Sequence, residues 1–265
     1  MAARPLLTAA AALLVGAAAV PLATKHDAKH VLLTRGQDPA MAYSWYEKRA
    51  PSGACLADSE RQSQLHQDQW ALESTHCMRG GYYVDIGSNS GVTISNTYAL
   101  DVRFGWRGLC ADPFPHDMAN RTCTVVEGVM WDVPGETVVF EQTHGDDGVF
   151  GSVVGVDSGR EANITANAPT NVTFVTVTPR ETFARHGVPA VLSLDVEGSE
   201  LHVLRGIDYA THCFRNIALE SNKVEPMRSE MRGLLEARGY AYVGSELFDD
   251  YYQSACAGSV SPHHP

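Results

Sequence analysis

The fold of this chain is decided by residues 82–91, which read YYVDIGSNSG. An apolar run of five residues that carries one carboxylate, Asp85, predicts a strand. The two glycines that follow predict a tight turn, and a helix is expected from about Gly91 to Asp101. A second apolar run, residues 190–196, is typical of a central parallel strand that is buried on both faces. Together the two runs predict an α/β domain.

The rest of the chain alternates apolar runs with amphipathic segments, which predicts a doubly wound sheet with helices on both faces. Further strands are expected at 107–111, 124–130, 172–177, 216–220, 240–243 and 250–253, with a local hairpin at 138–140 and helices that begin at Pro179, end near Arg205 and cover 226–238. The Gly- and Asp-rich stretch 143–169 has no clear period and is expected to form a surface insertion or lid.

The composition is that of one ordinary globular domain with modest appendages. The chain has 265 residues, and its 31 Asp and Glu residues outnumber its 20 Lys and Arg residues, for a formal net charge of -11. A chain this acidic repels a phosphate backbone, and so nucleic acid is not expected as a partner.

The N-terminal part of the chain differs in composition from the domain. Residues 5–23 are uncharged and apolar, and residues 1–23 are expected to be a secretory signal peptide or a type II membrane anchor. A plastid or mitochondrial transit peptide is the alternative. Residues 24–62, which mix glycines, prolines and charges, are expected to form a stem. The domain is expected over 63–256, and a disordered tail over 257–265.

The cysteines and the glycosylation sequons favour the secretory pathway. The six cysteines are an even number without a C-x-x-C pair, so up to three disulfides of open pairing are expected, with six reduced thiols as the alternative. Asn120, Asn163 and Asn171 each begin an N-x-[ST] sequon. We therefore expect a protein of the endoplasmic reticulum or Golgi lumen, membrane-anchored or secreted, with the plastid as the alternative.

Polar side chains follow several expected strands at the point where each strand ends, and ligands bind at this edge of a doubly wound sheet. The turn after residue 86 could hold a pyrophosphate or the carboxylate of an amino-acid cofactor, but Asn89 stands where a dinucleotide fingerprint requires glycine. Asp112 could accept two ribose hydroxyls, or could be a solvated loop carboxylate. Asp195 and Glu197 follow a buried strand, where two carboxylates are costly unless they bind something. The pattern predicts a site for a nucleoside-containing cofactor.

Five motifs of the chain are similar to those of one known family. The two long ones are DIGSNSG at 85–91 and LDVEGSELHVLRG at 194–206, and the shorter ones are SQLHQD at 63–68, GWRGLC at 105–110 and LESN at 219–222. By these motifs, residues 60–253 resemble the FkbM-type methyltransferases in their eukaryotic branch, which use S-adenosylmethionine. The resemblance implies a class I methyltransferase fold, a Rossmann-like, doubly wound and mostly parallel sheet of seven strands.

The resemblance also implies roles for individual residues. The methionine part of the cofactor would be held by Asp85, Gly87, Ser88, Asn89 and Gly91, its ribose by Asp112, and its adenine would lie near Glu127, Val129 and Trp131. Asp195 and Glu197 would face the methyl group and the acceptor. The chain departs from the common family pattern at Ser88 (usually Ala), at Asp112 (usually Glu) and at His202 (often acidic).

Transfer of a methyl group to a hydroxyl needs a base for the hydroxyl proton. We expect this base to be Asp195 or Glu197, with Glu220 as the third candidate, while His66 and His144 are expected to be solvated loop residues. No metal ion is expected, and a magnesium ion between Asp195, Glu197 and the substrate is the alternative. The predicted function is O-methylation of a glycan or another small hydroxylated acceptor. The alternative is a catalytically inactive, membrane-anchored protein that acts in interaction or trafficking.

Overall fold

The structure is a computed structural model of the chain, and it describes residues 55–144, 149–157, 169–186 and 191–254. All of these residues belong to one compact unit. The expected leader, the stem up to residue 54, the Asn163 sequon and the tail at 257–265 lie outside the described residues. Within the described part of the chain, no helix is both long enough and apolar enough to cross a membrane.

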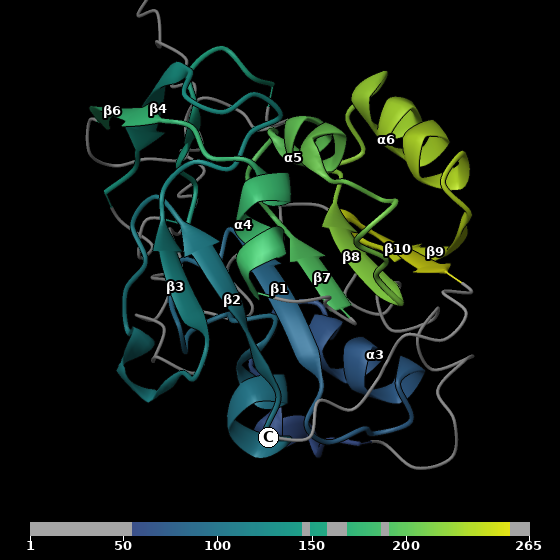
Figure 1. Cartoon of the computed structure of the whole chain (residues 1–265). Coiled ribbons are helices and arrows are strands. Elements are labelled where there is room, and N and C mark those ends of the chain that lie inside the picture. The colour runs from purple at the N-terminus through teal and green to yellow at the C-terminus, as the bar shows by residue number, and fades with distance from the viewer. Residues whose placement is uncertain (1–54, 145–148, 158–168, 187–190, 255–265) are drawn as a thin grey trace, which may run out of the picture. The chain divides into compact units, whose positions relative to one another are not determined.

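Seven strands form the main sheet, in the spatial order β3-β2-β1-β7-β8-β10-β9 (Figure 1). The strands are β1 (Tyr82–Ile86), β2 (Arg107–Asp112), β3 (Thr124–Glu127), β7 (Val191–Leu194), β8 (Asn216–Glu220), β9 (Tyr240–Glu246) and β10 (Asp249–Ser254). The pairs from β3 through β8 are parallel, and β10 runs antiparallel to both β8 and β9. This order confirms the expected doubly wound, mostly parallel, Rossmann-like sheet. From β1 the chain adds β2 and β3 toward one edge of the sheet, and it adds β7 and β8 toward the other. The boundary between β1 and β7 is therefore the switch point at which such sheets bind ligands.

Helices cover both faces of this sheet, as Figure 1 shows with α4, α5 and α6 grouped together and α3 apart from them. The helices are α3 (Gln67–Ser74), α4 (Pro179–His186), α5 (Glu200–Gly206) and α6 (Met227–Glu236), and the short turns are η1 (Asp58–Glu60), the π-helical η2 (Ala99–Arg103) and η3 (Met118–Asn120). Side chains alternate along a strand. Val84 and Ile86 of β1 therefore join a core cluster with α4, α5 and α6, whereas Tyr83 joins a second cluster with α3 and η2.

Three further strands form a separate small sheet in the order β5-β4-β6. They are β4 (Thr137–Gln142), β5 (Ser152–Val153) and β6 (Thr170–Val175), and β4 pairs antiparallel with both neighbours. The hairpin expected at 138–140 is thus present as β4 and β5. The strand expected at 172–177 is β6, which pairs in the small sheet rather than in the main one.

The segment after the β1 turn differs from the prediction. The helix expected from Gly91 to Asp101 is wrong in its first part, because helical structure begins only at Tyr98. The residues before it form an irregular turn in which serine hydroxyls take the backbone N–H groups: Ser90 Oγ accepts the N–H of Thr93, and Ser95 Oγ accepts the N–H of Tyr98. Serine competes in this way with the helical hydrogen-bond pattern.

Disulfides join Cys55 to Cys77 and Cys110 to Cys123, and Cys213 is disulfide-bonded as well. No cysteine in the described ranges is free. The expectation of disulfides is therefore confirmed, and the alternative of six reduced thiols is wrong. The first bond also ties residues assigned to the end of the stem to the domain, and the neighbouring Leu56 is only 2% exposed.

Candidate active site

The turn after β1 lies directly against the loop after β7. The Asp195 N–H donates to the Ile86 carbonyl oxygen at 3.0 Å, and the Gly87 N–H donates to the Ala111 carbonyl oxygen at 2.8 Å. Gly87 has a φ of +84°, and a Cβ atom at this position would lie 1.6 Å from the Asp195 carbonyl oxygen. Only glycine fits here. The glycine therefore allows the contact that brings the β1 turn and Asp195 to one place.

Asp112, the last residue of β2, is bonded to the same turn rather than solvated. Its carboxylate accepts the Asn89 N–H at 2.9 Å and the Phe114 N–H at 2.7 Å. Burial raises the pKa of Asp112, and these two donors oppose the rise. Each carboxylate oxygen has two lone pairs, so each could accept one further hydroxyl from a ligand. Glu127 is the register neighbour of Asp112 on β3 and is exposed.

Asp85 is buried in β1 behind the turn, and it is 2% exposed. Its Oδ2 accepts the Thr97 hydroxyl at 2.5 Å, and the Ser193 side chain also hydrogen-bonds to it. Burial raises the pKa of Asp85 to about 6, against the lowering effect of the Arg121 guanidinium. A cation brought close to this carboxylate would lower its pKa again.

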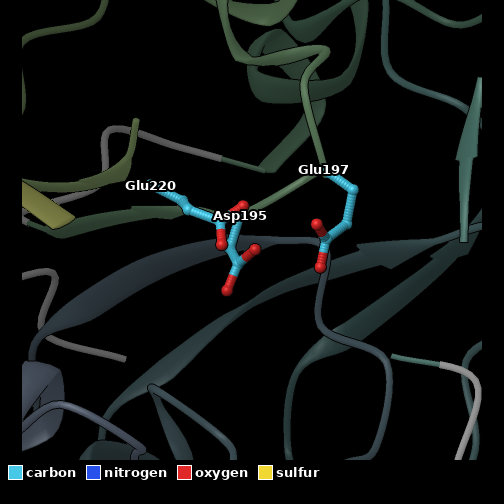
Figure 2. A group of neighbouring side chains, drawn as sticks. All are labelled: Asp195, Glu197 and Glu220. Atoms are coloured by element: carbon cyan, nitrogen blue, oxygen red, sulfur yellow. The ribbon is translucent and has the colours of Figure 1, made fainter. Parts of the chain in front are cut away.

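Three acidic side chains lie together at the carboxyl ends of β7 and β8. Each of Asp195, Glu197 and Glu220 offers an oxygen within 4.8 Å of the others. Figure 2 shows the carboxyl group of Asp195 between those of the other two. Glu197 and Glu220 are buried, at 6% and 3% exposed. Such a group could accept a proton from a bound hydroxyl, or could supply the oxygen ligands that a divalent cation prefers.

Glu200 holds the loop that carries two of these carboxylates. Its side chain accepts the Val196 N–H at 2.9 Å and the Gly198 N–H at 3.1 Å, and it is 1% exposed. Glu197, which lies between Val196 and Gly198 in the chain, has a left-handed φ of 58°. Burial raises the pKa of Glu200 to about 7. The sequence gives no separate signal for Glu200, because a Glu near a helix start is ordinarily explained by the helix dipole.

Acidic side chains are concentrated at this edge of the sheet. Burial raises the pKa of Asp85, Asp112 and Asp249, and in each case the charge of Asp195 adds to the rise. The Arg121 guanidinium acts on Asp85, but it already forms a buried ion pair with Asp101 at 2.9 Å. An excess of buried carboxylates favours a ligand that carries positive charge.

Two of the residues expected near an adenine lie in the core of the small sheet. Val129 and Trp131 are buried with Val153, and the Trp131 ring stacks on His202 with 3.8 Å between the ring centroids. The Nδ1 atom of His202 is 3.0 Å from Asp132 Oδ1. One face of the indole is therefore already covered.

The small sheet reaches the end of β2 through aromatic contacts. The Phe114 ring packs against the rings of Phe140 and Phe174, with centroid distances of 5.9 Å and 5.4 Å. Phe114 is also the residue whose N–H binds Asp112. The strands that border the 143–169 insertion therefore stand beside the carboxylate expected at the ribose.

His66 is not the solvated loop residue that was expected. It precedes α3 with a φ of 62°, its Nδ1 is 3.3 Å from Glu246 Oε1, and its side chain is 15% exposed. The next residue, Gln67, donates to Asp249 Oδ2 at 2.7 Å. These contacts join residues 180 and 182 positions apart, so no local pattern could have signalled them. His144 is exposed, as expected.

One buried hydroxyl at the turn has no partner within the described ranges. Ser88 is 5% exposed, and its Oγ has no hydrogen-bond partner among the residues that the structure describes. An unpaired buried hydroxyl costs about 1–3 kcal/mol. A polar ligand group that reaches the turn would remove this cost, and the turn therefore fits a polar, positively charged cofactor.

Comparisons with known proteins give matches to a family model and to solved structures. A family model described as methyltransferase FkbM domain matches residues 85–242, a range that contains the turn, Asp112 and the three acidic side chains. Among solved structures, the chain is similar to precorrin-6y C5,15-methyltransferase from Geobacter metallireducens, at 12% identity and a TM-score of 0.36, over 75% of this chain and 91% of that one. The comparison with curated proteins gives no match.

Proposed function

This chain belongs to the FkbM methyltransferase family, and we propose that it transfers a methyl group from S-adenosylmethionine to a hydroxyl of a glycan or another small hydroxylated acceptor. One observation carries the proposal: a glycine turn, a carboxylate bonded to that turn and three acidic side chains meet at the switch point between β1 and β7. Doubly wound sheets bind their ligands at this place.

The cofactor would be held by the turn and its neighbours, in the places that the family resemblance gives them. The methionine part would lie at Asp85, Gly87, Ser88, Asn89 and Gly91, and the ribose at Asp112. S-adenosylmethionine supplies an already activated methyl group on a positively charged sulfonium. Two observations support this ligand. The Ser88 hydroxyl has no hydrogen-bond partner in the described residues, and a polar group of the cofactor would supply one. The buried carboxylates outnumber the cations near them, and the sulfonium would add a positive charge.

The protein's chemical tasks are to align the acceptor hydroxyl and to take its proton. Asp195 is the proposed base, and the neighbouring Glu197 and Glu220 are the alternative candidates for this role. The closeness of the three carboxylates makes three negative charges at this place unfavourable, which favours uptake of the hydroxyl proton by one of them. No metal ion is part of this mechanism.

We propose further that the protein works in the secretory pathway, with residues 1–23 as its leader or anchor. Disulfides support this compartment, because they persist where the environment is oxidising. The exposed positions of Asn120 and Asn171 leave room for glycans at two of the three sequons.

Calorimetric titration of the whole chain with S-adenosylmethionine tests the central claim. We expect micromolar binding that is lost in Asp112→Ala and kept in Glu230→Ala, whose exposed side chain lies on α6. A screen of hydroxylated glycans for release of S-adenosylhomocysteine would then identify the acceptor class. A folded sample that gives neither heat nor a thermal shift would overturn the enzyme hypothesis in favour of the anchored interaction protein.

A further inference from the structure

Arg121 lies in the connection between β2 and β3, outside the residues to which the family resemblance gives a role. We infer that Arg121 is a positioning residue of the cofactor site, which holds the Asp85 carboxylate and the irregular turn after Gly91 in place through Thr97. This inference rests on the proposed function, because Asp85 is expected at the cofactor.

The Arg121 side chain is completely buried, and all five of its N–H donors have acceptors. Nε donates to Asp101 Oδ2 at 2.9 Å, Nη1 donates to the Gly91 carbonyl oxygen at 3.0 Å and to Ser95 Oγ at 3.1 Å, and Nη2 donates to the Tyr83 hydroxyl at 2.8 Å and to Thr97 Oγ1 at 2.7 Å. Three of these acceptors belong to the segment 91–97. The guanidinium therefore holds this non-helical segment through one backbone carbonyl oxygen and two side-chain hydroxyls.

Thr97 connects this guanidinium to the Asp85 carboxylate. Its hydroxyl accepts from Arg121 and donates to Asp85 Oδ2 at 2.5 Å. The direction of the hydroxyl hydrogen is thereby fixed toward Asp85, since the Arg121 donor occupies the other side. Asp85 is thus held in one orientation by a chain of two hydrogen bonds.

Arg121 also acts on Asp85 by charge. The guanidinium lowers the pKa of Asp85 against the larger rise that burial causes. A residue with only a packing role would not change the ionisation of Asp85. The two roles can therefore be separated by measuring the pH dependence of the site.

The residues that follow Arg121 are themselves held in place. Asp101 accepts the hydroxyl of Thr122 at 2.7 Å and its N–H at 2.9 Å. The next residue, Cys123, is bonded to Cys110 in β2. The preceding Asn120 is exposed, so a glycan on this sequon would point away from the buried guanidinium.

The experiment compares Arg121→Met with Arg228→Met in the full chain. Arg228 is a matched control because it makes a paired contact with another buried carboxylate, Asp250, at 2.7 Å and 2.8 Å. The ionisation of Asp85 is followed by carboxyl ¹³C NMR without cofactor, with Asp85→Asn for assignment, and S-adenosylmethionine affinity is measured from pH 5 to 9. Thr97→Val removes the hydroxyl that joins Arg121 to Asp85, and it is a smaller change in case Arg121→Met does not fold.

In Arg121→Met we expect the pKa of Asp85 to rise by about two units, so that affinity falls about tenfold at pH 7 and recovers toward pH 9. Thr97→Val should shift both quantities in the same direction by less, and Arg228→Met should shift neither. If folded Arg121→Met or Thr97→Val keeps the wild-type midpoint and affinity, the inference is wrong. If the titration midpoint of Asp85 shifts in Arg121→Met but the wild-type protein binds no S-adenosylmethionine, Arg121 does control Asp85 and the proposed function fails.

Discussion

Replacing Asp85 with Asn should make the cofactor-free protein more stable. The carboxyl group is 2% exposed, and burial raises its pKa from 3.8 to about 6. Between these values the folded state keeps a proton that the unfolded chain has lost, so the stability of the wild-type protein falls as the pH rises through this window. Two pKa units correspond to about 3 kcal/mol at about pH 7.5. The neutral amide avoids this cost and can still accept the hydroxyl of Thr97.

Thermal unfolding of Asp85→Asn and wild-type protein at two pH values measures the effect. For a domain of this size about 3 kcal/mol is a rise in Tm of roughly 6–12 °C. The gain should be about half as large at pH 5, where folded Asp85 is already protonated and only ionisation of the unfolded chain remains. Asp58→Asn is the control, since that side chain is 92% exposed. The reasoning is refuted if Asp85→Asn is no more stable than the wild type at pH 7.5, or if the gain is larger at pH 5.

Three further predictions concern the turn and the acidic side chains. Gly87→Ala should destabilise the protein by more than about 3 kcal/mol in urea unfolding, because the added Cβ meets the Asp195 carbonyl oxygen at 1.6 Å; an unchanged midpoint would contradict this geometry. Asp195→Asn should lower kcat by about 10²–10⁴-fold and leave S-adenosylmethionine affinity within about threefold, and a larger loss in Glu220→Gln would move the base to that residue. Dialysis against EDTA should leave binding and turnover unchanged, whereas a rate restored by Mg²⁺ would assign the three carboxylates to a metal ion.

The main sheet could be predicted from sequence because each of its strands is marked locally. The run at 82–86 is apolar apart from Asp85, the doubly buried run before Asp195 is apolar apart from Ser193, and the structure places both as neighbours in the centre of the sheet. The prediction of a helix over 91–101 was wrong in its first part for a reason that is local in the sequence. Ser90 and Ser95 accept backbone N–H groups that the helix would need. The small sheet was missed because its pairing joins β4 to β6 across an insertion, and periodicity alone does not reveal which sheet a strand enters.

Site residues divide in the same way between local and distant signals. Gly87 and Asp112 stand at strand ends where a turn and a ligand are expected, and their contacts with Asp195 and Asn89 follow from that placement. Arg121 carries no such mark: as the middle residue of a sequon it would ordinarily be an exposed loop side chain. Its burial is decided by acceptors 20 to 38 positions earlier in the chain. A charged residue taken fully out of water needs all of its donors paired, so the distant contacts and the buried position of Arg121 depend on each other. Such a residue can be recognised only when the acceptors are seen together, which is why the structure reveals it and the sequence does not.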